Sequence, residues 1–403
     1  MKKVLILGAG VYQVPLILKA KEMGLYTIVV SRVGNYPGFE FADKCYYIDT
    51  TAKEEILEVA KENNIDAICT TGTDVAVRSI GYVNDAMGLS GISNTGAVRT
   101  TDKLEMQKCF HKGGVGSAEY RAVKTSEEAV AAATEIGYPV VVKCVDSSGS
   151  RGITTVSSDA ETIDAFNEAK KYTRKDYVLV EEMLTGRELC VSGYIYDRKI
   201  AFLAPHNKHS VEKAGIPISI GHSFPYRATD EVISNIRKEL QLTADALDLD
   251  NCAFNADAFD DNGKINIVEI GGRAGATCIP ELIKMHYDVD YYKAVLLGAL
   301  GEEVTFEESE GKRPCTARLL MSPVDGVLSE INFDGLREIE EEGVSISLDY
   351  KVGDAVEEMQ NGTSRIGHML IYTDDCSKVD EVESRIYEHI YLSGNSLREL
   401  WKR

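Results

Sequence analysis

The first hundred residues alternate short apolar runs with segments of helical periodicity. The runs KKVLILG, YTIVVS and DAICTT have the length and composition of buried strands. Residues 14–24 and 53–64 carry apolar positions spaced for one face of a helix. Strands that alternate with helices form parallel sheets, so the pattern predicts a parallel α/β domain over residues 1–100.

The pattern changes near residue 100. A helix is predicted from about Lys103 to the glycine-rich HKGGVGS. A second helix, TSEEAVAAATEI, has Thr125 and Glu128 at capping-box positions and Gly137 just after its end. Strand-like runs follow: YPVVVKCV, GITTV, YVLVEEML, RELCVSGYIYD and RKIAFLAP. The charged, turn-rich segment 302–314 is the expected linker to a last α+β module.

Composition excludes several classes of function. The chain has 403 residues and a formal charge of −20, which argues against a nucleic-acid partner because phosphate backbones need excess Lys and Arg. No run reaches the ~20 apolar residues that span a bilayer, so no membrane partner is expected. The start MKKVLILGAG is interpreted as a strand rather than a signal peptide. Nine scattered cysteines without a CxxC pair indicate a reduced, cytoplasmic location.

The turn GAGVYQ follows a strand and opens a helix, as a dinucleotide-binding turn does. The third glycine position holds Gln13, and the second strand ends in Ser31-Arg32 with no acid to hold a ribose. A tight strand-to-helix turn is therefore preferred over an NAD site, which remains the alternative.

Lys143 lies in the middle of the valine-rich strand YPVVVKCV, directly before the loop 147–152. Burying its ammonium group is costly unless it meets an anion. Backbone N–H groups of a small-residue loop can close over phosphates. The combination favours a phosphate site over a solvated lysine on an edge strand.

Acidic residues cluster where the strand YVLVEEML ends. Glu181 could accept from the amino group of adenine, the main chain near Met183–Leu184 could contact a ring nitrogen, and Glu188 could bind ribose hydroxyls. Taken alone, acids at a strand end are more often simply solvated.

The segment CAFNADAFDDNGKINIVEIGGRAGAT is the most specific constellation. Asp257 and Glu269 lie on the two strands of a predicted hairpin, with Arg273 just beyond. Carboxylates that face each other repel unless a cation lies between them, and Mg²⁺ takes one or two carboxylates plus phosphate oxygens. The alternative is one inward and one outward acid on an ordinary hairpin.

The turn of this hairpin decides between the two. A two-residue turn at Asn262-Gly263 would pair Asp257 with Val268 and send Asp257 and Glu269 to opposite faces. A shared cation requires both on one face. We therefore predict a connection of three or five residues that sets Asp257 directly opposite Glu269.

These four elements, in this order and spacing, resemble the ATP-grasp superfamily over nearly the whole chain. The likeness is greatest to its carboxylate–amine ligases, which include L-amino acid ligases, phosphoribosylglycinamide synthetase and carbamoyl-phosphate-synthetase-like proteins. The resemblance implies a parallel-sheet domain at 1–100 and a two-lobed ATP-grasp domain at 101–301, with a nucleotide lid at about 115–180. A biotin carboxylase-like α+β module would occupy 302–403.

The resemblance also implies roles for individual residues. Those implied to bind ATP are Lys103, Lys143, Ser148, Gly149, Ser150, Arg151, Gly152, Glu181, Glu182, Met183, Leu184 and Glu188. Asp257 and Glu269 match the ligands of Mg²⁺ or Mn²⁺. Arg273 matches the arginine that steadies the transferred phosphoryl group, and Arg318 falls where biotin carboxylase-like enzymes place a functional arginine.

One departure stands out. Many members read Glu-x-Asn-Pro-Arg, whereas this chain reads Glu269-Ile270-Gly271-Gly272-Arg273. The third metal ligand of the pattern is therefore absent, which puts a second tightly held ion in doubt.

The function implied is ATP- and Mg²⁺-dependent joining of a small-molecule carboxylate to an amine through an acyl phosphate, with a homodimer possible. The alternative within the class is a phosphoribosylglycinamide synthetase of purine biosynthesis. From a different class, the chain could be a nucleotide-binding protein without catalysis. The identities of the carboxylate and the amine stay open.

Overall fold

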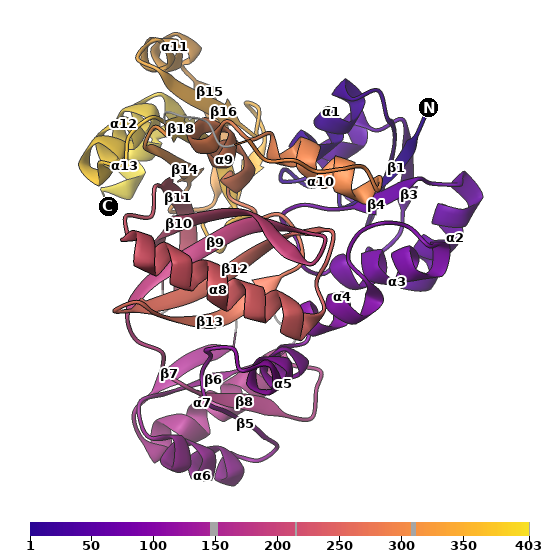
Figure 1. Cartoon of the computed structure of the whole chain (residues 1–403). Coiled ribbons are helices and arrows are strands. Elements are labelled where there is room, and N and C mark those ends of the chain that lie inside the picture. Colours follow the sequence, from indigo (N-terminus) through magenta and orange to yellow (C-terminus); the bar gives the residue numbers. More distant parts are fainter. Residues whose placement is uncertain (146–151, 214–215, 308–311, 403) are drawn as a thin grey trace. The chain divides into compact units, whose positions relative to one another are not determined.

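The computed structural model describes residues 1–145, 152–213, 216–307 and 312–402 (Figure 1). The chain divides into two compact units. The first comprises Met1–Ala204, Arg227–Ala274 and Tyr292–Thr305, and the second comprises Pro205–Tyr226, Gly275–Tyr291 and Phe306–Arg403. Among the described residues, no helix combines the length and apolarity needed to cross a membrane.

The first unit begins with a parallel four-stranded sheet in the order β3-β2-β1-β4. Its strands are β1 (Lys3–Leu7), β2 (Tyr26–Ser31), β3 (Lys44–Tyr47) and β4 (Ala67–Cys69). The helices of this region are α1 (Val14–Glu22), η1 (Pro37–Phe41), α2 (Lys53–Asn63), α3 (Val77–Met87) and α4 (Asn94–Thr101). Val4 to Leu7 of the central strand are fully buried. The predicted parallel α/β fold is therefore confirmed.

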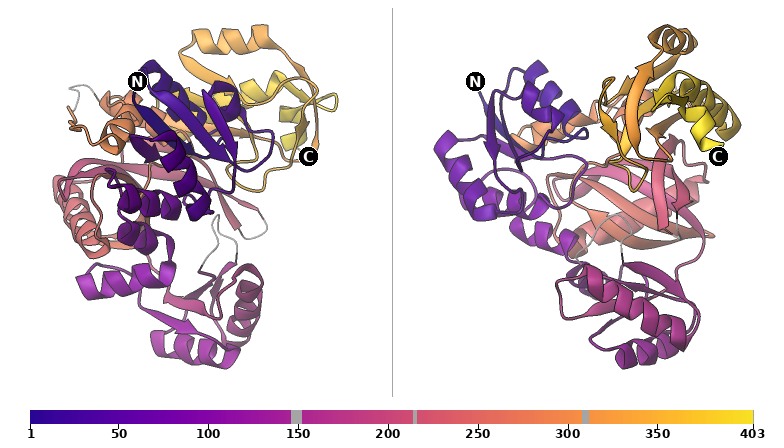
Figure 2. Two further views of the ribbon diagram at one scale, coloured as in Figure 1. Left: turned by 90° about the vertical axis from the view of Figure 1, so that its right-hand side faces the viewer. Right: turned by 180° about the vertical axis from the view of Figure 1, so that it is seen from behind.

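A second sheet in this unit is antiparallel, with the order β5-β8-β6-β7. Its strands are β5 (Tyr120–Val123), β6 (Val140–Lys143), β7 (Ile153–Val156) and β8 (Val178–Glu182). Helices α6 (Ser126–Ile136) and α7 (Asp159–Tyr172) lie together on one face of it (Figures 1 and 2). Val140, Val142 and Val180 pack with Phe166 in the core under these helices. Because side chains alternate along a strand, Lys143 and Glu181 occupy the opposite face.

The predicted capping box of α6 is half formed. The Thr125 side chain accepts from the Glu128 backbone N–H, as expected. The Glu128 carboxylate, however, accepts from the backbone N–H of Lys124 at 2.7 Å. The acid thus caps one residue earlier than the motif requires, and the helix still ends at Ile136 before Gly137.

The remainder of the first unit is built on long antiparallel strands. The elements are β9 (Arg187–Tyr196), β12 (Cys252–Asp261), β13 (Lys264–Gly271) and the first part of β10 (Lys199–Lys213), with α5 (Lys103–Gly113), α8 (Asp230–Leu247) and most of α10 (Tyr291–Ala299). β12 lies between β9 and β13. Figure 1 shows α8 lying across this part of the sheet.

The β12–β13 hairpin both confirms and corrects its prediction. Asp257 pairs directly with Glu269, as predicted. The predicted three- or five-residue loop is wrong, because Asp261 pairs with Lys264 across a two-residue turn. Asn262 has φ 53° and Gly263 has φ 91°, the left-handed conformations that such a turn needs. The register instead shifts at a β-bulge: Ala258 pairs with Ile267, so Val268 is the extra residue.

The second unit continues β10 into β11 (Ile216–Phe224), β14 (Cys315–Met321), β18 (Arg365–Ile371) and β16 (Val344–Leu348), in that order. A smaller sheet has the order β17-β15-β19-β20, formed by β17 (Ala355–Val356), β15 (Gly326–Ile331), β19 (Ile390–Leu392) and β20 (Asn395–Ser396). The helices are α9 (Ile279–Tyr287), α11 (Phe333–Glu341), α12 (Cys376–Glu388) and α13 (Leu397–Trp401). One core joins both sheets, with Leu320, Leu328, Ile366 and Ile386 among its fully buried members. The last α+β module predicted from the sequence thus has a core of its own.

Candidate active site

Lys143 and Glu181 form a buried ion pair on the face of the β6–β8 strands that the helices leave open. The Lys143 Nζ lies 2.5 Å from the Glu181 Oε2, and each residue is 5% exposed. Strand pairing explains the contact: Val141 pairs with Glu181, and Lys143 is the next residue on the same face as Val141. The anion that the sequence analysis expected beside Lys143 is therefore supplied by the protein itself. Sequence reasoning missed this because the two residues were assigned to different parts of one nucleotide.

The other residues predicted to bind the base and ribose lie around the end of β8. Glu182 is exposed and its Oε2 accepts from the Glu119 backbone N–H at 3.2 Å. Met183 is exposed, Leu184 is half-buried, and both lie outside any helix or strand. Glu188 is exposed on β9, opposite Phe259 of β12. Their roles in adenine and ribose binding stay predictions.

The predicted phosphate loop is described only at its end. Ser148, Gly149, Ser150 and Arg151 lie outside the described residues. Gly152 has φ +67°, and its carbonyl accepts from the Cys144 backbone N–H at 3.0 Å. A Cβ there would lie 3.1 Å from the Cys144 Sγ and from the Tyr172 side chain. Glycine is therefore favoured at position 152 for two reasons, its left-handed backbone and the lack of room for a Cβ beside Cys144 and Tyr172.

Asp257 and Glu269 face each other across the hairpin, and each has a distinct neighbour. The Glu269 Oε2 lies 3.2 Å from the Nζ of Lys103, the first residue of α5. The thiol of Cys190 on β9 donates to the Asp257 Oδ1 at 2.8 Å. The Glu269 carboxylate raises the pKa of Lys103, so this ammonium group stays charged at neutral pH. The structure therefore brings together Lys103, Asp257 and Glu269, whose roles in ATP and metal binding stay predictions.

Cys190 is a neighbour of the site that the sequence alone did not single out. It is 1% exposed and pairs with Asp257 in the β9–β12 ladder. The alternation of β9 could have placed it opposite Asp257 only once the pairing of β9 with β12 was known. A second missed neighbour is Asp74, in the turn after β4, whose Oδ2 accepts from the Arg273 Nη2 at 2.8 Å.

Arg318 lies in the second unit, on β14, and its guanidinium is held by helix α12. The Nη1 donates to the Glu383 Oε2 at 2.9 Å, and the Nη2 lies 3.1 Å from the Asp380 Oδ1. Burial raises the pKa of the Glu383 carboxyl, against the opposing effect of Arg318. This geometry accounts for Arg318 as an anchor of α12 to the sheet; its predicted catalytic role stays a prediction.

The turn GAGVYQ is filled by its own side chain. The Gln13 Oε1 accepts from the Gly10 backbone N–H at 2.9 Å, and the Gln13 Nε2 donates to the Thr71 carbonyl oxygen. In a dinucleotide-binding turn this space and these N–H groups serve the pyrophosphate. The local packing of Gln13 therefore favours the structural interpretation of the turn over NAD binding.

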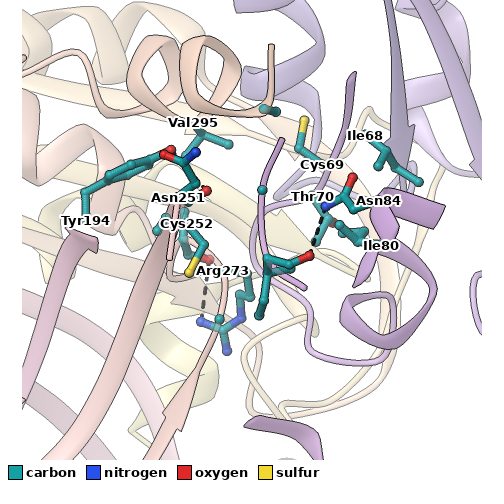
Figure 3. Close-up of a pocket in the computed structure, with 16 residues that line it drawn as sticks. Ile68, Cys69, Thr70, Ile80, Asn84, Tyr194, Asn251, Cys252, Arg273 and Val295 are labelled. Carbon is teal, nitrogen blue, oxygen red and sulfur yellow. Dashed lines mark hydrogen bonds between the residues drawn. The ribbon is translucent and has the colours of Figure 1, made fainter. Parts of the chain in front are cut away.

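A small cavity lies beside Arg273 in the first unit (Figure 3). Its volume is about 40 Å³, and its walls include Ile68, Tyr194 and Val295. The Asn84 Nδ2 donates to the Ile92 carbonyl oxygen at 3.0 Å along this wall. Figure 3 shows the guanidinium of Arg273 pointing away from Tyr194. Substrate pockets measure roughly 300 Å³ or more, so this cavity is a packing void rather than a nucleotide site.

Comparison with known proteins identifies the core of the chain. Residues 136–281 match the model of the ATP-grasp domain. A formate-dependent phosphoribosylglycinamide formyltransferase of Wolinella succinogenes is 26% identical over 292 residues, which cover 71% of this chain and 73% of that protein. The chain spans about half the length of several further curated relatives, 48–50%.

Solved structures extend the likeness to nearly the whole chain. The phosphoribosylglycinamide synthetase from Anaerococcus prevotii superposes with a TM-score of 0.80 at 27% identity, over 97% of this chain and 99% of that one. The biotin carboxylase domain of Hydrogenobacter thermophilus 2-oxoglutarate carboxylase, solved with MgADP, ADP and bicarbonate, gives 0.79 at 18% identity, over 100% and 94%. The second comparison shows the fold alone. Residues 136–281 therefore match the ATP-grasp domain, and the likeness in sequence and fold to the phosphoribosylglycinamide synthetase structure extends over nearly the whole chain.

Proposed function

We propose that this protein is an ATP- and Mg²⁺-dependent ligase that activates a small carboxylate as an acyl phosphate and joins it to an amine. The observation that carries the proposal is the direct pairing of Asp257 with Glu269. Lys103 contacts one of these carboxylates, and Arg273 follows two residues after β13 ends. This is a charge arrangement suited to a nucleotide phosphate and its cation rather than to a structural hairpin.

The residues present fit Mg²⁺ and ATP. Asp257 and Glu269 offer hard carboxylate oxygens on neighbouring strands, which is the donor type that Mg²⁺ prefers. Lys103 and Lys143 offer ammonium groups to phosphate oxygens. When bound, Mg²⁺ would neutralise charge on the phosphates and polarise the γ-phosphoryl group.

The contribution of the protein to such a reaction is positioning and charge. Lys143 would leave Glu181 to contact a phosphate, and Arg273 would hold the phosphoryl group as it moves to the substrate carboxylate. The acyl phosphate is then attacked by the amine, and phosphate leaves. The protein needs no nucleophile of its own for these steps, because its fixed cations stabilise the developing negative charge.

A purine-pathway ligase is the second candidate. It is favoured by the phosphoribosylglycinamide synthetase structure, at 27% identity over 97% of the chain, and by the phosphoribosylglycinamide formyltransferase relative. The two candidates differ only in substrates. Glycine with phosphoribosylamine, or formate with phosphoribosylglycinamide, should support turnover in one case, and amino acid pairs in the other.

A substrate screen scored by ADP release tests both candidates. Carboxylates and amines are offered singly and in pairs with ATP and Mg²⁺, and hydroxylamine is added to trap an acyl phosphate as a hydroxamate. Glu269→Gln serves as the inactive control. Binding of ATP without ADP release from any pair would instead favour a nucleotide-binding protein without catalysis. A homodimer stays a prediction, which light scattering would check.

A further inference from the structure

The turn that follows β4 is fixed against the segment that follows β13. Thr71 forms a parallel β-bridge with Ala274, and the Gly72 backbone N–H donates to the Ala274 carbonyl oxygen at 3.0 Å. The Asp74 Oδ2 accepts from the Arg273 Nη2 at 2.8 Å. These three contacts lie within the first unit, and they set the backbone of the turn and the guanidinium of Arg273 in one arrangement.

Gly271 is small because Asp74 occupies the space beside it. A Cβ at residue 271 would lie 2.6 Å from the Asp74 Oδ1, closer than real Cβ atoms approach. The backbone of Gly271 is not in the left-handed region, so its conformation does not require glycine. The requirement is one of space. A carboxylate from the first hundred residues thus stands where a side chain at position 271 would begin.

This carboxylate reaches the same face of the hairpin as the predicted metal ligands. Side chains alternate along β13, so position 271 shares a face with Glu269, which pairs with Asp257. In the family pattern Glu-x-Asn-Pro-Arg, this position carries the asparagine that the present chain lacks. Asp74 therefore places a carboxylate oxygen on the face of the hairpin where the asparagine of the family pattern would place its amide oxygen.

Arg273 has few other fixed partners among the described residues. Its side chain is 14% exposed, and its Nη1 donates to the Ala274 carbonyl oxygen at a long 3.5 Å. Its Nε is buried, with no hydrogen-bond partner in the described part of the chain. Asp257 and Glu269 also attract the guanidinium and raise its pKa along with Asp74, against the effect of burial. Without Asp74, the guanidinium would be free to turn toward the carboxylates that a cation needs.

We propose that Asp74 is a positioning residue. Its carboxylate occupies the space beside Gly271, where no side chain is present, and binds the Nη2 of Arg273. This contact keeps the guanidinium directed at the phosphoryl group. The inference rests on the proposed ligase function, in which Arg273 contacts that group. Asp74 acts through Arg273 and need not touch the substrate.

The test compares Asp74→Ala, Asp74→Asn and Gly271→Ala with their Asp74→Ala/Gly271→Ala double variant. Misplacing a catalytic group by about 1 Å can cost roughly 100-fold in rate, so kcat for ADP release should fall roughly 10- to 100-fold in the single alanine variants. The dissociation constant of Mg·ADP, measured by calorimetry, should stay within about twofold, since the γ-phosphoryl group is absent. Asp74→Asn keeps the shape and one acceptor oxygen and should lie between wild type and Asp74→Ala.

The double variant carries the decisive comparison. If both substitutions act by displacing one carboxylate, the second adds nothing, and the double variant equals the worse single variant. Independent, multiplicative losses would overturn the proposal. So would an Asp74→Asn variant whose affinity for Mg·ADP falls while its kcat stays unchanged.

Failure of this inference is distinguishable from failure of the proposed function. Arg273→Met serves for that purpose. If Arg273→Met abolishes ADP release while Asp74→Ala leaves kcat unchanged, the ligase stands and the positioning role is wrong. If Arg273→Met itself leaves kcat unchanged, the role of Arg273 in the proposed function is wrong, and the inference falls with it.

Discussion

The Lys143 Nζ lies 2.5 Å from the Glu181 Oε2, and both side chains are shielded from solvent. A nucleotide that uses Lys143 for a phosphate must exchange one anionic partner of the lysine for another. The pair orients the lysine before ATP arrives, since a buried ammonium group without a partner is costly.

Lys143→Met should weaken ATP binding by about 2–4 kcal/mol, in line with the loss of a desolvated charge pair. Isothermal calorimetry measures the change directly. The matched control is Lys124→Met, which removes a lysine of the same sheet region whose partner, Asp176, is exposed. Unchanged ATP affinity in Lys143→Met would contradict the phosphate role.

Glu181→Gln removes the negative charge of the pair and leaves the lysine in place. It leaves the Lys143 charge buried without its carboxylate, so the protein without ligand should lose stability, by about 3–5 kcal/mol for a buried pair. ATP brings a replacement anion, so it should raise the melting temperature more in Glu181→Gln than in the wild type. An equal shift in both proteins would show that Lys143 does not meet the phosphates.

Asp257→Asn and Glu269→Gln should each weaken Mn²⁺ binding in the presence of ADP, because each removes an anionic oxygen from one cation. A loss of roughly tenfold or more is expected, read by electron paramagnetic resonance of free Mn²⁺. Asp261→Asn is the control: it lies on the same strand but pairs with Lys264 at the turn. Loss of affinity in all three variants alike would point to general charge rather than to a site.

The hairpin shows what the sequence could and could not predict. The need for two carboxylates on one face led correctly to the pairing of Asp257 with Glu269. The same reasoning placed the odd residue in the loop, whereas the structure places it within the strand, at Val268. Turn chemistry was the more reliable local signal, because Asn262-Gly263 strongly favours a two-residue turn. A bulge leaves no comparable mark in the sequence.

Three strands and two helices of the first hundred residues, and their parallel α/β class, followed from apolar periodicity, since each buried strand is short and flanked by a helix. Contacts between distant segments did not. No local pattern singled out Asp74, because its contact with Arg273 depends on the bridge between Thr71 and Ala274. Similarly, the Lys143–Glu181 pair depends on the pairing of strand β6 with strand β8, which no local sequence pattern determines.

His368 should make the second unit less stable in acid. Burial lowers the pKa of this imidazole to about 4, helped by Arg365, from the ordinary value of 6.5. The unfolded chain then binds more protons than the folded one below pH 6.5, so the stability is complete above that pH and falls as the pH drops toward 4. The loss approaches ~3 kcal/mol at 1.36 kcal/mol per pKa unit.

His368→Leu should remove most of this acid dependence. Melting temperatures from pH 7.5 to pH 4.5 measure it, with His389→Leu, which removes the histidine at the C-terminal end of α12 in the same unit, as the control. Parallel curves for wild type and His368→Leu would contradict the assignment.

Arg318 can be assigned to structure or to catalysis by removing its partner along with it. Arg318→Met alone leaves the Glu383 carboxyl buried without its cation, and it should cost about 3–5 kcal/mol of stability. Arg318→Met/Glu383→Leu removes both charges, so stability should return toward the wild type. Asp380 is 63% exposed at its side chain and can be solvated without a partner. Two measurements then decide, the melting temperature and the rate of ADP release. A double variant that is stable and active establishes the anchoring role, whereas a stable double variant without turnover establishes the catalytic one.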